Sequence, residues 1–411
     1  MKPSIVFVDD ESNVLSGLKR MLYPMQDEWD MSFCLTARHA LKVMEGKRPD
    51  ILVTDLVMPD MDGTQLLEQV CAKYPGVIRI VLSGHSDKRL GIKAARFAHQ
   101  FLPKPFQADE LKKAIKRILS LRVVFTSSEV QTMAAKMDTF PSLPKVHQQI
   151  MQELQSSNPS INSVADLISQ DLGLSASVMK MVNSAFFGLR TKVSSPLHAV
   201  NLLGLDIISA LALSAHLFTS FDMTQFPGFD LDRLWQHCLA TGMFSKSIAR
   251  AEGLGTRDQD DFYISGILHD IGKLTMLAYG QGFYKNVVAM SQKENISIWR
   301  AEQNALGSSH AELGGYLLSL WGMDEEIVLS VYYHHNLEKF AGDAPLAASA
   351  LHAANCFEHE LTEINPGYAL HPLDMEAASR LGYAERVPAW KQACENALKE
   401  VREHGSEDSD S

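Results

Sequence analysis

Two groups of residues in this sequence have the types that chemistry at a phosphorus atom needs. The first group lies near the start of the chain and is mostly acidic, with Asp9, Asp10 and Asp55 followed by Ser83 and Lys104. Carboxylates that lie close together repel one another, and a hard divalent cation such as Mg²⁺ relieves that repulsion. A metal ion, an ammonium group and a hydroxyl together neutralise a phosphoryl group carried on a carboxylate. This group therefore predicts phosphoryl transfer to an aspartate.

The second group is rich in histidine and lies further along the chain. Residues 264–274 read ISGILHDIGKL, in which His269 and Asp270 are adjacent and Lys273 follows about one helical turn later. The other candidates are His237, His310, His334 and His335. Imidazole nitrogens and a carboxylate suit Fe, Mn or Zn, and such an ion activates water for attack on phosphorus, with Lys273 as a phosphate contact. Taken alone, this group predicts a metal-dependent phosphohydrolase.

Short apolar runs alternate with amphipathic segments over residues 1–121. The runs are rich in Val, Ile and Leu, as strands buried on both faces are, and they cover residues 4–10, 51–56, 78–84 and 100–105. This alternation predicts a parallel sheet with helices on both faces, where ligands gather at the carboxyl ends of the strands. Asp9, Asp10 and Asp55 fall at those ends. The Lys104–Pro105 bond is a candidate cis peptide that would aim the lysine inward.

The order of these motifs resembles the receiver domain of two-component response regulators, over residues 1–121. The matching motifs are VDDE at 8–11, DLVMPDMDG at 55–63, LSG at 82–84 and LPKPF at 102–106. The resemblance implies a flavodoxin-like α/β fold, doubly wound around five parallel strands. It also implies a sensor histidine kinase as the phosphodonor, a downstream signalling protein as the target, and a homodimer formed through the receiver as a possible assembly.

By the same resemblance, Asp55 is the expected phosphoacceptor. Asp10 and Asp55 are expected to bind Mg²⁺ directly, with Asp9 assisting and the Val57 carbonyl contributing.

Three further residues are expected to respond to phosphorylation. Ser83 and Lys104 would contact the phosphoryl oxygens, and Phe101 occupies the position of the family's switch aromatic. The phosphoryl group adds about two negative charges. Ser83 would then move toward it, and Phe101 would rotate inward to change the surface of the last strand and helix.

From residue 138 onward strand signals nearly vanish and a helical period takes over. Residues 122–137 lack that period and are expected to be a linker, whereas residues 138–340 are expected to form an all-α domain, with helix breaks at Gly173 and Gly204. This domain resembles the HDOD family, a relative of the HD phosphohydrolases. The matching stretches include FPSLPKV at 140–146, ISQDLGLSASVMKMVNSAFFG at 168–188, GILHDIGKL at 266–274, SHAELGGYLLSLWG at 309–322 and YYHH at 332–335.

Two departures from the HD phosphohydrolases favour a non-catalytic output domain. Those enzymes close their metal site with a second aspartate on a later helix, where this chain has Asn355, an uncharged and poorer ligand, with Glu358 or Glu360 as alternatives. Phosphodiesterases of the HD-GYP type carry a GYP stretch after the paired histidines, and residues 334–345 contain none. The His–Asp pair would then only orient helices.

Two alternatives remain for the histidines. His334 and His335 are also placed to cap a helix C-terminus as cations. The rival function is a receiver-controlled, metal-dependent phosphodiesterase acting on a cyclic dinucleotide or nucleotide.

Composition restricts the remaining possibilities. The net charge of −11 argues against a dedicated nucleic-acid binder, so we expect no direct DNA binding. No apolar run reaches the roughly 18 residues of a membrane span. Five scattered cysteines without a CxxC pair favour reduced thiols, and we expect a cytoplasmic protein. Residues 341–404 are expected to add helices, and residues 405–411 to form a disordered acidic tail.

Overall fold

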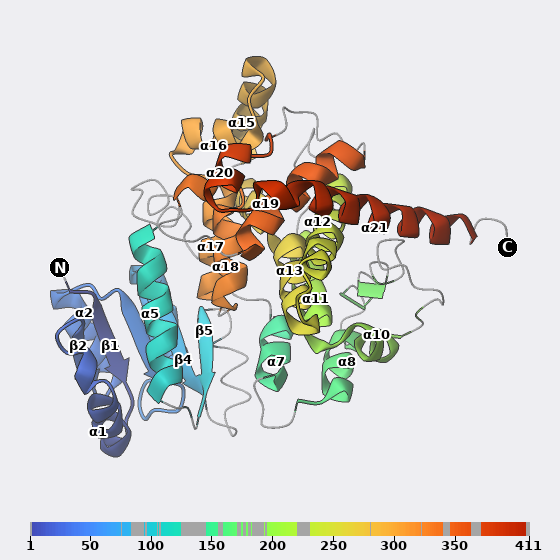
Figure 1. The fold of residues 1–411 in the computed structure, drawn as a ribbon. Helices are drawn as coiled ribbons and strands as arrows, with labels where there is room; N and C mark the ends of the chain where they lie inside the picture. The colour runs from blue at the N-terminus through green and yellow to red at the C-terminus, as the bar shows by residue number, and fades with distance from the viewer. Residues whose placement is uncertain are drawn as a thin grey trace. The chain divides into compact units, whose positions relative to one another are not determined.

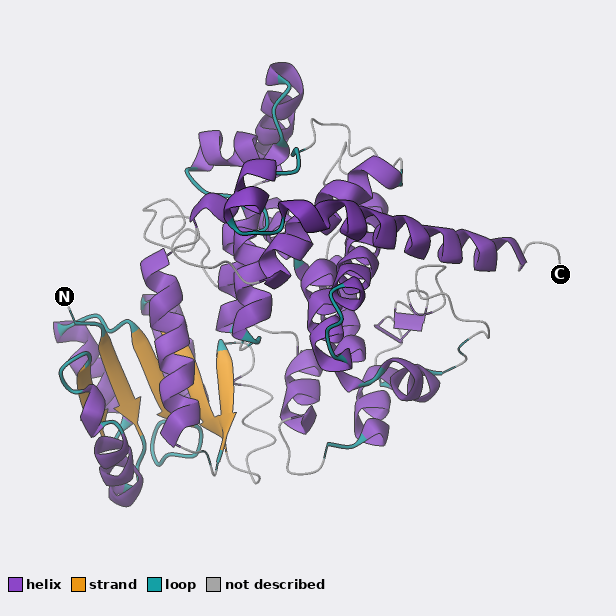
Figure 2. Cartoon of the chain, in the orientation of Figure 1, coloured by secondary structure: helices purple, strands orange, loops and turns teal. Residues whose placement is uncertain are grey.

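The computed structural model describes the chain in ranges separated by gaps. The described ranges are 2–74, 76–83, 97–104, 108–124, 145–154, 159–170, 195–219, 231–279, 281–321, 323–339, 346–362 and 371–407, with isolated residues between them. The chain divides into two compact units, one of residues 1–157 with 319–322 and one of residues 158–318 with 323–411. The first unit contains the sheet and the second contains most of the helices (Figures 1 and 2).

A five-stranded parallel sheet forms the core of the first unit, as the sequence predicts. Its strand order is β2-β1-β3-β4-β5. The strands are β1 (Ser4–Val8), β2 (Asp30–Cys34), β3 (Ile51–Asp55), β4 (Ile78–Ser83) and β5 (Gln100–Pro103). Asp55 is the last residue of β3 and lies opposite Leu82 in the ladder, while Ser83 lies opposite Pro103. The candidate acidic residues and Lys104 therefore lie at one edge of the sheet, because parallel strands all end on the same side.

Helices cover both faces of this sheet. They are α1 (Ser12–Met21), the 3₁₀ turn η1 (Tyr23–Met25), α2 (Ala37–Gly46), α3 (Gly63–Lys73) and α5 (Ala108–Val124). Val6 and Val8 of β1 and Leu52 of β3 point to one face, where they share a buried apolar cluster with residues of α2 and α3. The intervening strand residues are equally buried on the opposite face, since side chains alternate along a strand. α3 begins with a capping box between Asp62 and Gln65.

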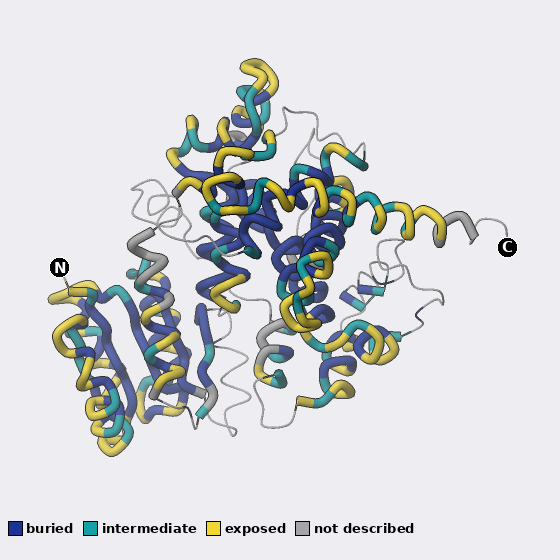
Figure 3. The backbone as a smooth tube through the Cα atoms, viewed as in Figure 1, coloured by how far each residue is buried: buried dark blue, intermediate teal, exposed yellow. Residues whose placement is uncertain are grey.

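The rest of the chain is helical among the described residues. α12 packs against α13, α19 and α21; α12, α13 and α19 are largely buried, whereas α21 is mostly exposed (Figure 3). The helices are α7 (Lys145–Leu154), α8 (Ile161–Ser169), α10 (Pro196–Leu203), α11 (Leu205–Thr219), α12 (Leu231–Ala251), α13 (Thr256–Leu268), α14 (Ile271–Tyr279), α15 (Gln281–Glu294), α16 (Ile298–Leu306), α17 (His310–Leu320), α18 (Glu325–Tyr333), η4 (Leu337–Lys339), α19 (Leu346–Leu361), α20 (Met375–Arg380), η5 (Ala384–Arg386) and α21 (Val387–Glu407).

The structure tests several expected helix breaks and helix ends. The break at Gly204 is confirmed, because α10 ends before it and α11 begins after it. Residues 261–277 form two helices, with His269 and Asp270 between them. α5 continues to Val124, and α21 to Glu407, so the first three residues expected in a disordered tail are helical. The expected break at Gly173, most of the expected linker and residues 408–411 lie outside the described residues.

None of the helices in the described ranges combines the length and the apolar character that crossing a membrane requires.

Candidate functional sites

Lys104 joins the two buried carboxylates of the acidic group. Its Nζ lies 2.5 Å from Oδ1 of Asp55 and 2.9 Å from Oδ2 of Asp9. The backbone N–H of Val57 donates to Oδ2 of Asp55 at 2.9 Å, whereas the Val57 side chain and Asp10 are exposed. Asp9, Asp55 and Lys104 therefore meet at the strand ends, and exposed residues lie next to them in the sequence.

The charges at this edge balance one another. Burial raises the pKa of Asp55, and Asp9 adds to the rise, although the Lys104 ammonium acts in the opposite direction. Burial pushes the pKa of Lys104 down, but the two carboxylates outweigh it and the pKa is raised. Lys104 therefore stays cationic at neutral pH, where it offsets part of the repulsion between Asp9 and Asp55.

The remaining receiver candidates are described only in part. Phe101 lies in β5 and is partly buried against the apolar cluster on the α2 and α3 face of the sheet. The backbone of Ser83 ends β4, but its side chain lies outside the description, as does Pro105 and thus the proposed cis peptide.

In the helical unit, all the histidine candidates converge. His237 comes from α12, His310 begins α17, and His334 and His335 directly follow α18. His269 and Asp270 lie between α13 and α14. All six side chains are buried, as is that of Lys273 in α14.

Two glycines allow this convergence. A Cβ on Gly272, between Asp270 and Lys273, would overlap the backbone carbonyl of His310. A Cβ on Gly266 would overlap the backbone of Gly242 in α12. Only glycine lets these backbones approach so closely, which is why α13 and α14 can present the His–Asp pair to α12 and α17.

Asp270 lies at the centre of the histidines. Its Oδ2 lies 2.6 Å from Nζ of Lys273, 3.4 Å from Nε2 of His269 and 3.6 Å from Nε2 of His237. Its Oδ1 lies 3.1 Å from Nε2 of His310. Burial raises the pKa of Asp270, but the neighbouring His269 ring, the Lys273 ammonium and His310 together outweigh burial and hold that pKa well below its usual range. One carboxylate thus faces two sets of imidazoles.

The backbone fixes the proton on two of the rings. Nδ1 of His269 lies 2.7 Å from the carbonyl of Gly266, and Nδ1 of His334 lies 2.6 Å from the carbonyl of Val331. A carbonyl only accepts, so each Nδ1 must carry the hydrogen and each Nε2 must carry a lone pair. Nε2 of His334 is buried and has no hydrogen-bond partner among the described residues. That lone pair is available to a metal ion.

Burial keeps most of these rings neutral. It lowers the pKa of His237 to about 4 and that of His269 to about 3, and it also lowers the pKa values of His334 and His335. His334 caps the end of α18 through the Val331 carbonyl, and its lowered pKa favours a neutral donor over the cationic cap that was the alternative. His310 differs: burial lowers its pKa, but Glu302 and Asp270 outweigh burial and raise it.

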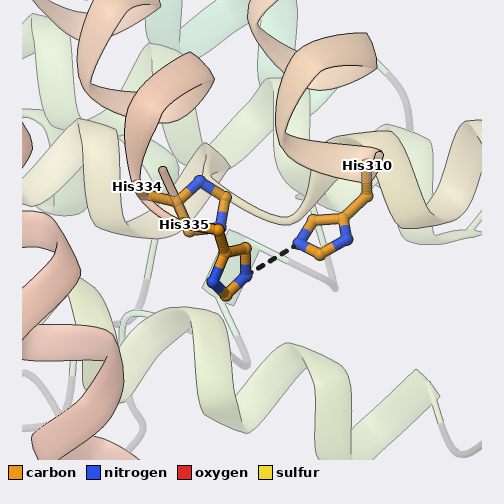
Figure 4. Close-up of side chains that lie close together, drawn as sticks. All are labelled: His310, His334 and His335. Atoms are coloured by element: carbon orange, nitrogen blue, oxygen red, sulfur yellow. Dashed lines mark hydrogen bonds between the residues drawn. The ribbon is translucent and has the colours of Figure 1, made fainter. Parts of the chain in front are cut away.

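The spacing of the ring nitrogens fits a metal site. Nε2 of His237 lies 3.1 Å from Nε2 of His269, and Nε2 of His335 lies 3.1 Å from Nε2 of His310 (Figure 4). Two nitrogens bound to one ion at about 2.1 Å are about 3.0 Å apart at a 90° angle and about 3.4 Å apart in a tetrahedral site. Potential ligand atoms gather in three sets, His237–His269–Asp270 and His310–His334–His335 around Asp270, and His237–Glu358–His359 on the outer side of His237. Imidazoles and one carboxylate suit Zn, Fe or Mn, so the residues fit the implied metal.

Sequence reasoning missed Glu302 and His359 as neighbours of these rings, and it named Glu358 only as an alternative to a second aspartate. Glu302 in α16 lies beside His310, and Glu358 and His359 in α19 lie beside His237. Glu302 is buried on the same side of α16 as Ile298 and Trp299, and this acidic residue at an apolar position was the available signal. The sequence could not show that Glu302 pairs with His310, because α16 and α17 are brought together only by the tertiary structure.

The structure also separates the alternatives to a second aspartate. Glu360 is largely exposed and pairs with Lys391, so it takes no part in the site. Asn355 is buried with its Oδ1 unpaired among the described residues. Glu358 contacts Nδ1 of His237, on the ring edge away from His269, and does not replace the missing ligand.

Comparison with known families divides the chain in the same way. The family model of the response regulator receiver domain matches residues 5–116, and that of the HDOD domain matches residues 140–337.

Curated relatives each match part of the chain. An uncharacterized protein of Treponema pallidum (strain Nichols) is 27% identical over 232 residues, which cover 54% of this chain and 44% of that protein. The DNA-binding transcriptional regulator NtrC of Proteus hauseri is 33% identical over 123 residues, or 29% of this chain and 25% of that protein. Transcriptional regulatory protein PrrA of Mycobacterium leprae (strain TN) is 33% identical over 135 residues, or 32% and 56%. The chain thus matches less than two thirds of each.

Two solved structures share the fold. An HDOD domain protein of unknown function from Geobacter sulfurreducens aligns with a TM-score of 0.51 and 24% identity, over 70% of this chain and 96% of its own. A protein from Shewanella amazonensis SB2B aligns with a TM-score of 0.51 and 19% identity, over 68% and 97%. At these identities the likeness supports the fold alone.

Proposed function

Because this chain joins a receiver domain to an HDOD domain, and so is a response regulator with an HDOD output domain, we propose that a sensor histidine kinase phosphorylates it on Asp55. The observation that carries the proposal is the position of Lys104, whose ammonium contacts both Asp55 and Asp9. An ammonium there is within reach of a phosphoryl group on Asp55, and its charge stabilises that group.

The residues around Asp55 have separate tasks in the transfer. An Asp55 carboxylate oxygen attacks phosphorus, a P–O bond forms, and the P–N bond of the kinase phosphohistidine breaks as the imidazole leaves. Asp9, Asp10, Asp55 and the Val57 carbonyl would hold Mg²⁺, which when bound neutralises charge on the phosphoryl oxygens. Lys104 and Ser83 contact those oxygens. Phe101, now partly buried, rotates further inward and passes the change to the surface of β5 and α5.

Labelling with a small phosphodonor tests this assignment. The full chain, incubated with acetyl phosphate and Mg²⁺, should gain an acid-stable, base-labile phosphoryl group, and Asp55→Asn should gain none. Asp60→Asn is the matched control, because Asp60 is exposed in the same loop and has a positive φ of 63° that asparagine tolerates. If Asp55→Asn is labelled as strongly as the parent, another residue is the acceptor.

For the output domain we propose a metal-holding scaffold that signals to a downstream protein without turnover. The supporting observation is the burial of its site: His269, His310 and His334 are each 0% exposed and Asp270 is 1% exposed. Catalytic metal sites keep a position open to substrate, whereas structural sites are closed by protein ligands. Fe, Mn or Zn held there would tie α12, α13, α17 and α18 together.

One observation favours the rival enzyme. Neutral imidazoles and one carboxylate are also a donor set that activates water for phosphodiester hydrolysis, and Lys273 would then contact the phosphate. Metal analysis of the purified chain, followed by assays on cyclic dinucleotides with a His269→Ala, Asp270→Ala control, separates the two functions. Hydrolysis that is lost in the control overturns the scaffold proposal.

The assembly and surroundings of the protein remain expectations in this proposal. A homodimer through the receiver, a cytoplasmic location and the absence of direct DNA binding are each consistent with a soluble regulator of net charge −11. A band-shift assay that finds sequence-specific, salt-sensitive binding would contradict the last of these.

A further inference from the structure

Two glutamates are buried behind the histidines, and neither function above uses them. Glu302 in α16 and Glu358 in α19 are both 0% exposed. Within the described part of the chain, no lysine or arginine forms an ion pair with either of them. Burying a carboxylate without a cation costs free energy, and this cost is offset only when hydrogen bonds satisfy the carboxylate oxygens. The partners of these two carboxylates are therefore informative.

Glu302 accepts three hydrogen bonds. Its Oε2 receives one from the backbone N–H of His310 at 2.9 Å and lies 2.6 Å from Nδ1 of the same ring. The Tyr284 hydroxyl donates to Oε1 at 3.0 Å. With Nδ1–H held by Glu302, Nε2 of His310 faces Asp270 and His335, at 3.1 Å from each.

Glu358 has the same relation to His237. Its Oε2 lies 2.5 Å from Nδ1 of His237, and the Thr362 hydroxyl donates to Oε1 at 2.5 Å. The opposite edge of the ring then presents Nε2 to Nε2 of His269, at 3.1 Å. The two sets around Asp270, His237–His269–Asp270 and His310–His334–His335, thus each contain one histidine whose outer edge contacts a buried glutamate.

We propose that Glu302 and Glu358 are positioning residues of a metal site, a proposal that rests on the metal-holding output domain proposed above. Each carboxylate accepts Nδ1–H, which turns the Nε2 lone pair of His310 or His237 toward the ion and makes that nitrogen a stronger ligand. The glutamates also place negative charge one ring away from the ligands. That charge compensates in part for Asn355, the amide at the position where a second carboxylate would bind.

Zinc binding to the full chain tests the proposal. Affinity for zinc alone is measured by competition with a chelator, in the parent, in Glu302→Gln and in Glu358→Gln, which keep the side-chain volume and an acceptor oxygen but lose the charge. Each variant should bind zinc about 10- to 100-fold more weakly. Glu360→Gln is the matched control, because Glu360 lies on the same helix as Glu358 but is largely exposed, and it should stay within about twofold of the parent.

A spectroscopic readout separates positioning from simple packing. In zinc-loaded protein labelled with ¹⁵N-histidine, the Nδ1–H resonances of His237 and His310 should move in the corresponding glutamine variant and stay in place in Glu360→Gln. A folding defect would appear instead in all histidine signals and in thermal unfolding.

The outcomes distinguish the two proposals. The positioning role alone is overturned if the parent binds zinc, both glutamine variants bind it with an affinity within twofold of the parent, and the Nδ1–H signals do not move. A parent that takes up no zinc overturns the metal site together with it.

Discussion

The acidic site and the histidine site are built on opposite plans. The acidic site lies where strands end, with Asp10 exposed and the Lys104 side chain 26% exposed. The histidine site lies between helices from distant parts of the chain, with its side chains sealed from solvent. A group that must be exchanged with a partner needs access, whereas a group that must be retained needs closure. The difference therefore matches a switch in one region and a fixed scaffold in the other.

Charge divides the two sites in the same way. At the sheet edge, two buried carboxylates contact one ammonium and a third carboxylate, Asp10, is exposed, a set of hard oxygen ligands that suits Mg²⁺. Among the histidines, Asp270 is the single carboxylate in the two ligand sets around it, and neutral nitrogens supply the remaining ligands. Such a site suits Zn, Fe or Mn rather than Mg²⁺, so Mg²⁺ should bind at the sheet edge and not among the histidines.

The largest expected effect comes from adding a side-chain atom where two backbones touch in the histidine site. Gly272→Ala should destabilise the helical domain by about 3 kcal/mol or more, because the added methyl meets the His310 carbonyl and cannot swing aside. Gly17→Ala in α1 is the matched change in the open region. No atom lies within 4 Å of a Cβ there, so stability should hold or rise by up to about 1 kcal/mol. Denaturant unfolding of both variants checks the contrast, and equal midpoints would contradict it.

A second change adds a carboxylate to the histidine site, so that it resembles the acidic site at the sheet edge more closely. Asn355→Asp should tighten zinc binding about tenfold, since a carboxylate replaces an amide that has an unpaired Oδ1 among the described residues. Without metal the same variant should unfold at a lower temperature, because a buried charge is left uncompensated. Chelator competition and thermal unfolding with and without zinc measure the two effects. A variant that is weaker in both would show that Asn355 does not face the ion.

The smallest expected effect concerns pH and lies in the sheet unit. Buried His99 accepts from the Arg79 backbone N–H at 2.9 Å, and its Nε2 lies 3.0 Å from the Arg79 guanidinium. Burial, and then the Arg79 charge, lower the pKa of His99 well below 6.5. Below about pH 6.5, His99 therefore binds a proton in the unfolded chain but stays neutral in the folded domain. Stability should be constant above that pH and fall below it, by up to about 1.4 kcal/mol per pH unit.

Hydrogen exchange at the β4 and β5 amides, compared between pH 7.5 and 5.5 after correction for intrinsic rates, measures this loss. His99→Asn keeps an acceptor for the Arg79 N–H but does not titrate, so its protection should vary less with pH. The same pH dependence in both proteins would assign the effect to other groups.

Much of the architecture was readable because it depends on local pattern. Four of the five strands followed from short apolar runs, whereas β2, which is mostly half-buried, was implied only by the family resemblance. Asp55 ends β3, and Asp9 and Lys104 directly follow β1 and β5, whose ends lie on the same side of the sheet. The helix break at Gly204 was visible in the sequence, since glycine ends helices. The division between α13 and α14 was not, because the apolar period continues through His269 and Asp270 while packing decides where the helix bends.

The sequence by itself determined the two domain classes and which residue types each could offer, because periodicity and motif order are properties of neighbouring residues. Only the tertiary structure decided which atoms face one another. Glu358 reaches His237 across 121 positions of sequence, and the tautomer of His269 depends on the carbonyl of Gly266. A ring has two nitrogens on opposite edges, and the packing of helices around it sets which edge meets a carboxylate, a carbonyl or an ion.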